Sequence, residues 1–361
     1  MLKRTTNLIA GAALAGMLAT SLATAPLFAQ GDSKTAAAKP HIDLAFCIDT
    51  TGSMQSEIEN VKAKTKELVA KLAGGKPSPI IRVGLVAYRD KGDSYVTKVF
   101  PFSEDIDQVV KDITSLKADG GGDTPEAVSE GLHVAVNDLK WSPESKTLKL
   151  LFLIGDAGPH SGATDFDYKA EAKSAISKGI QVNTLACQGL ERMPESEGVG
   201  VFKEIAKLAD GKFESLAYHQ TVVAADGTKK DVVASGGKVY LMRKGEADWK
   251  AGAGALAASG AADELKISDM PVSKTAASRG VGFYAARAAA PSFVGTAHGG
   301  RGAIVRDYAA ASAPASMTYG DEGFAAGGMG VSRNENNLAD VIYAATKDAA
   351  AKKLKVEFKD K

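Results

Sequence analysis

The feature that most constrains the fold is a regular alternation of short apolar runs and amphipathic segments between residues 41 and 217. The runs at 42–48, 80–88 and 148–154 are almost continuously apolar, which is typical of strands buried on both faces of a parallel sheet. Further strands are expected at 95–102, 180–187 and 212–216, and helices at 58–72, 105–116, 125–139, 168–177 and 201–209. This order predicts an α/β, doubly wound, mostly parallel six-stranded sheet with helices on both faces.

Two local signals add detail to this prediction. The short polar link RDKGD between the strands 80–88 and 95–102 predicts that they pair as a hairpin. Thr124 is expected to cap the helix over 125–139, with Pro125 at its first position.

The N-terminus has the layout of a secretory signal peptide. Lys3 and Arg4 precede an uncharged apolar run at 8–22, and small residues follow, with the cleavage site expected after Ala29. The run is shorter than the roughly 20 residues that a membrane-spanning helix needs. We therefore expect residues 1–29 to be removed and the mature protein to be exported, periplasmic or extracellular, with no membrane span.

The rest of the chain divides by composition. Residues 30–40 are small and polar, as in a linker, and 41–220 form the doubly wound domain. In the C-terminal region, 221–361, the runs 221–223, 231–234 and 239–242 predict a small antiparallel meander. An Ala/Gly-rich segment at 251–330 offers little for a dense core, and a helix at 337–351 with a short strand at 354–358 ends the chain.

Charge and cysteine content exclude several classes of function. The 44 Lys and Arg residues balance 43 Asp and Glu residues, so the chain lacks the surplus of clustered basic residues that nucleic-acid binding depends on. The 2 cysteines can supply neither a disulfide scaffold nor a four-thiolate zinc site.

Polar side chains gather where two of the predicted strands end. Asp49, Thr51 and Ser53 occupy alternate positions in FCIDTTGSM, so their side chains face the same way. Asp156 follows the strand 148–154, and the loop ADGGGDTPE delivers Thr124. Because ligands of open parallel sheets bind at the carboxyl ends of the strands, these residues are expected to converge. An all-oxygen set suits Mg²⁺, with Mn²⁺ or Ca²⁺ as alternatives, and the ion can accept a carboxylate from a partner.

At these residues the sequence resembles the von Willebrand factor A domain family. The family's metal-ion-dependent adhesion motif, D-x-[ST]-x-S followed by a distant Thr and a distant Asp, is matched at all five positions, by Asp49, Thr51, Ser53, Thr124 and Asp156. The resemblance covers about residues 41–217, includes the phrases IRVGLVAYRD and TLKLLFLIGDAG, and is strongest to bacterial secreted or periplasmic members with DTTGSM and GGGDTPE phrases. It implies the doubly wound fold, Mg²⁺ binding and protein–protein contact, and it does not extend to residues 221–361.

The strand order that the resemblance implies also bears on the cysteines. Cys47 lies on the first strand and Cys187 ends the fifth, and the fourth strand is expected between them. Their Cα atoms should then be about 9–10 Å apart, beyond the roughly 7 Å limit for a disulfide. We expect two buried thiols.

Four more residues are candidates for contacts at the rim of the site or with a partner: Asp90, Asp93, Asp123 and His160. Asp90 and Asp93 are equally well explained as turn residues of the hairpin. His160, four residues after Asp156, is a candidate general base. Glycines 120–122 are interpreted as a mobile loop that lets Thr124 approach the metal, because the phosphate-loop pattern is absent.

These observations favour a binding module over an enzyme. The hypothesis is an exported, metal-ion-dependent, adhesion-type domain that captures an acidic side chain of a partner protein. One alternative is a structural or envelope-assembly protein that self-associates through the same site. A metal-dependent hydrolase is less favoured, because the sequence offers no activated nucleophile.

Overall fold

The structure is a computed structural model that describes residues 39–122, 124–162, 165–223, 229–243, 249–264 and 331–358. The predicted signal peptide, most of the predicted linker, Asp123 and most of the Ala/Gly-rich segment lie outside the described residues.

The first sheet has six strands in the order β3-β2-β1-β4-β5-β6. Its members are β1 (His41–Asp49), β2 (Ile80–Tyr88), β3 (Thr97–Ser103), β4 (Leu148–Gly155), β5 (Ile180–Ala186) and β6 (Phe213–Ser215). Strand β1 pairs in parallel with β2 and β4, whereas β3 pairs with β2 in the antiparallel sense. The doubly wound, mostly parallel sheet and the β2–β3 hairpin are confirmed.

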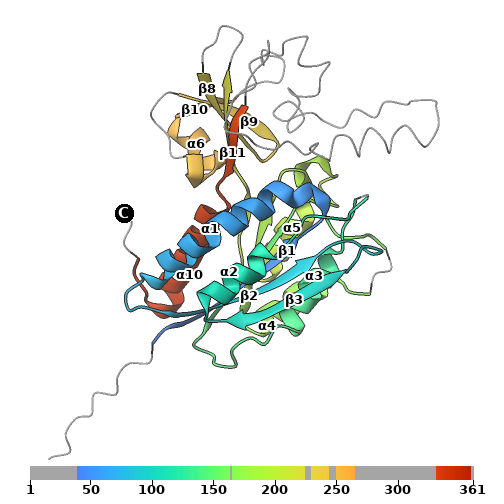
Figure 1. Ribbon diagram of the computed structural model, residues 1–361, viewed down its shortest axis with the longest axis vertical. Coiled ribbons are helices and arrows are strands. Elements are labelled where there is room, and N and C mark those ends of the chain that lie inside the picture. Colours follow the sequence, from blue (N-terminus) through green and yellow to red (C-terminus); the bar gives the residue numbers. More distant parts are fainter. Residues whose placement is uncertain are drawn as a thin grey trace, which may run out of the picture. The chain divides into compact units, whose positions relative to one another are not determined.

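Alternate residues of β1 supply two cores, one on each face of the sheet. Leu44, Phe46 and Ile48 belong to one hydrophobic cluster, and Ala45 and Cys47 to the other. The first is covered by α1 (Gln55–Ala73), α2 (Ile106–Thr114) and α10 (Leu338–Leu354), and the second by α3 (Val128–Asn137), α4 (Tyr168–Ser177) and α5 (Val199–Leu208) (Figure 1). Burial on both faces explains the near-continuous apolar strands.

One predicted helix start is wrong. Helix α3 begins at Val128 with Ala127 as its N-cap, whereas Thr124 and Pro125 stay outside the helix and are joined by a cis peptide bond. The reason lies in the neighbouring loop: the Glu126 backbone N–H donates to the Gly158 carbonyl at 2.9 Å, and Glu126 forms a parallel bridge with Pro159. These contacts hold the segment before α3 in an extended conformation beside the loop after β4.

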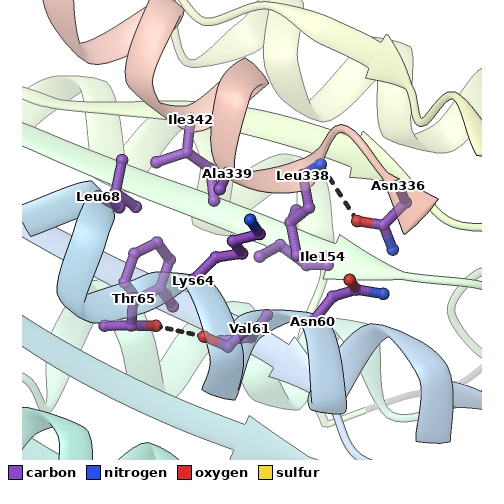
Figure 2. A pocket seen from close by; sticks show the side chains of 11 residues that line it. Asn60, Val61, Lys64, Thr65, Leu68, Ile154, Asn336, Leu338, Ala339 and Ile342 are labelled. Carbon is purple, nitrogen blue, oxygen red and sulfur yellow. Dashed lines mark hydrogen bonds between the residues drawn. The ribbon is translucent and has the colours of Figure 1, made fainter. Parts of the chain in front are cut away.

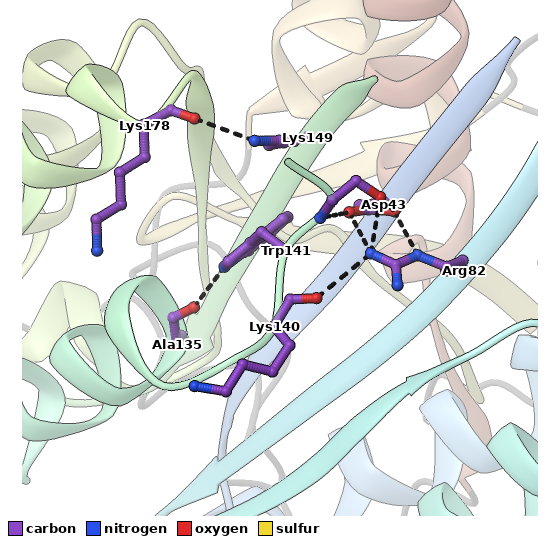
Figure 3. Close-up of polar contacts among 8 residues, drawn as sticks. Asp43, Arg82, Ala135, Lys140, Trp141, Lys149 and Lys178 are labelled. Atoms are coloured by element: carbon purple, nitrogen blue, oxygen red, sulfur yellow. Dashed lines mark hydrogen bonds and ion pairs between the residues drawn. The ribbon is translucent and has the colours of Figure 1, made fainter. Parts of the chain in front are cut away.

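A partly buried ion pair joins the amino-terminal ends of the central strands (Figure 3). Arg82 on β2 donates through Nε and Nη2 to the two carboxylate oxygens of Asp43 on β1, at 2.9 and 2.7 Å. The backbone N–H of Ser142 adds a third donor at 2.7 Å. Asp43 is 1% exposed, so its charge depends on these donors.

The second sheet is antiparallel, with five strands in the order β10-β9-β8-β7-β11. The predicted meander corresponds to β7 (Tyr218–Val223), β8 (Lys229–Ser235) and β9 (Lys238–Met242). Two strands that were not predicted, β10 (Ala262–Glu264) and β11 (Val331–Asn336), complete it. The helical segments η3 (Trp249–Ala251) and α6 (Ala253–Ser259) bring Trp249 and Leu256 into a core with Val233 and Tyr240.

Helix α10 returns to the first sheet, although it lies beyond the sequence-based boundary at residue 220. Leu338, Ile342 and Ala350 are buried in the same cluster as α1 and β1. Figure 2 shows Ile342 of α10 and Leu68 of α1 lining a small pocket that also includes Ile154 of β4. The second sheet is therefore inserted between β6 and the last helix of the doubly wound unit.

Two further sequence predictions concern membrane spans and cysteines. Within the described residues, no helix is both long enough and apolar enough to span a membrane. Cys47 and Cys187 are buried and free, and they belong to clusters on opposite faces of the sheet, with β4 between their strands.

Candidate functional site

The two aspartates of the predicted site lie side by side at the carboxyl edge of the first sheet. Ile48 of β1 is in register with Ile154 of β4, so Asp49 is level with Gly155 and one residue from Asp156. Asp49 is 0% exposed, and Asp156 is half-buried. The parallel pairing of two adjacent strands is what brings residues 107 positions apart in the sequence to one edge.

The segment after β1 turns Thr51 and Ser53 toward Asp49. The backbone N–H and the hydroxyl of Thr51 donate to Asp49 Oδ1 at 2.8 and 2.7 Å, and the Ser53 hydroxyl lies 3.4 Å from that of Thr51. Thr50 faces the other way, with its hydroxyl donating to the Tyr88 carbonyl at 2.9 Å. Burial decreases from Asp49 and Thr51 to the exposed Ser53, so the cluster opens to the surface.

The second oxygen of Asp49 is the observation that bears most directly on cation binding. Among the described residues, Asp49 Oδ2 has no hydrogen-bond partner although it is buried. Burial, followed by the negative charge of Asp156, raises the pKa of Asp49 well above its usual range. Burial likewise raises the pKa of Asp156, and the Ser53 hydroxyl acts against this shift. The carboxylates and hydroxyls fit a hard divalent cation, which would neutralise both charges.

The glycine loop is held beside the Asp49 segment by backbone hydrogen bonds. Gly52 N–H donates to the Gly120 carbonyl at 3.1 Å, and Gly121 N–H donates to Asp93 Oδ2 at 2.9 Å. Gly120 and Gly121 have φ of 75° and 67°, values that favour glycine. Asp93 thus supports this loop through its carboxylate.

Asp49, Thr51, Ser53 and Asp156 lie together at the end of β1 and β4. Thr124 is exposed, on the loop that precedes α3. Of the rim candidates, buried Asp90 contacts Nε2 of His160 through Oδ1, and Asp123 lies outside the described residues. His160 therefore has one ring nitrogen engaged with a carboxylate.

Glu126 is a site residue that the sequence analysis missed. It is 3% exposed, and its Oε2 has no hydrogen-bond partner among the described residues. Burial, with the charges of Asp49 and Asp90 next, raises the pKa of Glu126 to about 10. A Cβ added to Gly121 would lie 3.2 Å from Glu126 Oε1 and 3.0 Å from Thr51 Cβ, which places both side chains at this glycine.

The incorrect helix start concealed Glu126. In a helix beginning at Pro125, Glu126 would be an ordinary acidic residue of the first turn. The signal that was available is its place two residues after Thr124, in the same loop. Within the described part of the chain, no three His, Cys, Asp or Glu side chains form a metal cage, so a cation here would need the Thr51 and Ser53 hydroxyls.

Comparisons with known proteins agree with this architecture. Residues 43–219 match the family model described as von Willebrand factor A domain. A von Willebrand factor A domain-containing protein 7 of Rattus norvegicus is 34% identical over 148 residues, which are 41% of this chain and 15% of that protein. An alpha-protein kinase of Dictyostelium discoideum is 31% identical over 146 residues, 40% of this chain and 23% of that protein. The matches thus span between 15% and 23% of these two relatives.

Parts of this chain are also similar to solved structures, at lower identity. The conserved hypothetical protein BatB of Bacteroides thetaiotaomicron is 19% identical, with a TM-score of 0.37, over 49% of this chain and 89% of that one. A pilus adhesin of Lactobacillus rhamnosus GG is 14% identical, with a TM-score of 0.36, over 52% of this chain and 32% of that one. On the family-model match, residues 43–219 belong to the von Willebrand factor A domain family, whose members commonly mediate protein–protein interaction and adhesion.

Proposed function

We propose that the carboxyl edge of the first sheet binds a divalent cation and, through it, an acidic group of a partner protein. The observation that carries this proposal is the buried Asp49 Oδ2 without a hydrogen-bond partner among the described residues. Leaving a buried carboxylate oxygen unpaired is costly, and a cation removes that cost. Asp49, Thr51, Ser53 and Asp156 would hold the ion, with Thr124 joining from its exposed loop.

The proposed role of the ion is to present a positive charge to a partner. Two aspartate charges would balance a divalent ion, and the exposed Ser53 side of the cluster would leave the ion accessible from the surface. A glutamate or aspartate side chain of a partner would complete the oxygen ligands. Mg²⁺ is the proposed ion, with Mn²⁺ and Ca²⁺ as alternatives. Binding is proposed in preference to hydrolysis because the sequence offers no activated nucleophile.

The metal site is tested by thermal unfolding with Mg²⁺, Mn²⁺ or Ca²⁺ against chelator. The melting temperature of the parent protein should rise by several degrees with at least one ion, because an ion that binds only the folded state stabilises it. Asp49→Ala should lose this gain, and Asp263→Ala, which removes an exposed carboxylate of the second sheet, should keep it. An equal gain for Asp49→Ala and the parent would show that the cation binds elsewhere.

Partner capture is tested with immobilised peptides that differ only in one Glu or Gln. The Glu peptides should retain the protein in Mg²⁺ and release it when chelator is added, whereas the Gln peptides should not retain it. Retention that survives chelator would contradict capture through the ion.

We also propose that the protein acts outside the cytoplasm, on the strength of the leader at residues 1–29. The intact mass of the protein purified from its native source should correspond to a chain that begins at Gln30. A chain that retains residues 1–29 would contradict removal of the leader.

A further inference from the structure

We infer that Tyr218, the first residue of the inserted second sheet, is a positioning residue of the metal site and fixes the geometry of the two segments that carry its ligands. This inference rests on the proposed cation binding. It makes the inserted sheet part of the machinery that sets metal affinity.

The Tyr218 hydroxyl joins two segments that are distant in the sequence. It donates to Glu57 Oε1 at 2.8 Å and accepts the backbone N–H of Gln188 at 2.9 Å. Tyr218 is 6% exposed and Glu57 is 3% exposed, so water does not readily replace either partner. Each hydrogen bond reaches a segment next to a proposed ligand.

The Glu57 contact fixes the segment that carries Asp49, Thr51 and Ser53. Glu57 lies in the first turn of α1, four residues after Ser53, and the short helix η1 (Gly52–Met54) connects the two without a loop. Its other oxygen accepts the Ser56 hydroxyl at 2.6 Å. Holding Glu57 therefore holds the start of α1 and the orientation of the Ser53 turn.

The Gln188 contact supports the side that carries Asp156. Cys187 N–H donates to the Gly155 carbonyl at 2.9 Å, so this segment is fastened to the end of β4. Gly189 packs directly on Asp156, since a Cβ there would lie 3.2 Å from Asp156 Cβ and 3.4 Å from its Oδ2. A shift of Gln188 would move the surface against which the Asp156 carboxylate rests.

The position of Tyr218 is set by contacts between the two chain segments that lead into and out of the second sheet. Ala217 N–H donates to Asn337 Oδ1 at 2.8 Å, and Asn337 N–H donates to the Ala217 carbonyl at 3.2 Å. The Asn337 side chain also donates to the Lys250 carbonyl at 3.1 Å and is fully buried. These contacts fix the start of β7 to the start of α10, and with it the tyrosine ring.

The test is a calorimetric titration of the full chain with Mn²⁺. Tyr218→Phe removes only the hydroxyl and should weaken Mn²⁺ binding by about tenfold, the lower end of the effect of residues that orient metal ligands. Tyr240 is a buried tyrosine in the separate core of the second sheet. The Tyr240→Phe variant should bind Mn²⁺ with an affinity within about twofold of that of the parent.

A second variant and a double variant separate positioning from loss of folding. Glu57→Met replaces the carboxylate with a side chain of similar length that cannot accept the Tyr218 hydroxyl. It should also weaken Mn²⁺ binding, and the double variant should lose less than the product of the two single effects, because both changes remove the same hydrogen bond. If the parent binds Mn²⁺ and Tyr218→Phe binds equally well, the inference is wrong and the proposed function stands. If the parent and Asp49→Ala alike fail to bind, the proposed function is wrong and the inference falls with it.

Discussion

Thr51 donates two hydrogen bonds, from its backbone N–H and its hydroxyl, to the same oxygen of Asp49. This pairing fixes the carboxylate plane and directs Oδ2, which has no hydrogen-bond partner among the described residues, away from Thr51. An aspartate that accepts hydrogen bonds through one oxygen only, with its second oxygen unpaired, is suited to binding a cation and poorly suited to a purely structural role.

The pH dependence of stability should report on Glu126. Its pKa is raised from 4.5 to about 10, so the folded protein keeps a proton that the unfolded chain has released. Its stabilising contribution is then complete below about pH 4.5 and is lost as the pH rises towards about 10. Urea unfolding in chelator should show Glu126→Gln gaining stability relative to the parent between about pH 5 and about pH 9. Parallel profiles for the two proteins would contradict this assignment.

The Asp43–Arg82 pair should matter for stability and leave the metal site unaffected. Arg82→Ala leaves the buried Asp43 charge with fewer donors and should lower the free energy of unfolding by about 2–4 kcal/mol. Lys238→Ala, which breaks an exposed ion pair with Glu264, should cost less than about 1 kcal/mol. Urea unfolding measures both, and a Mn²⁺ titration of Arg82→Ala should match the parent. A large loss of affinity would show that the two ends of the sheet are coupled.

Gly155, the last residue of β4, should tolerate no side chain. An added Cβ would overlap the Tyr88 hydroxyl and lie 3.5 Å from Asp49 Cβ, and Tyr88 is fully buried. Gly155→Ala should cost about 1–3 kcal/mol in unfolding free energy and weaken Mn²⁺ binding. Gly122→Ala is the matched control for the unfolding measurement alone, because a Cβ at Gly122 meets nothing within 4 Å. Equal behaviour of the two variants would argue against the packing described for β4.

Helix α10 should unfold together with the doubly wound unit. Ile342 is 3% exposed in the core that α10 shares with α1, so Ile342→Ala should lower the free energy of unfolding by about 2–4 kcal/mol. Ile176→Ala removes the same side chain from the exposed face of α4, where it is 41% exposed, and should change stability little. Urea unfolding followed by far-UV circular dichroism makes the comparison. An Ile342→Ala protein as stable as the Ile176→Ala protein would show that α10 is not needed by the core.

Local patterns were sufficient to predict the sheet and most of the proposed ligands. Apolar runs such as 148–154 are typical of buried strands, and alternation along an extended segment puts Asp49, Thr51 and Ser53 on one side. The adjacency of Asp49 and Asp156 was also predictable, because parallel strands end at one edge. Each of these predictions depends on interactions within about five residues or on a general rule of sheet packing.

Tertiary contacts decided the rest. Glu126 is buried at the site because its backbone bonds to Gly158, a contact between loops that no local pattern encodes. Helix α10 has a weakly patterned, alanine-rich sequence, and only its packing against α1 gives it a place in the first core. The sequence by itself therefore determined the elements and the residues at their ends, since these follow from periodicity. The tertiary structure decided which distant segments share a core and which carboxylates are buried, because burial depends on how the whole chain is assembled.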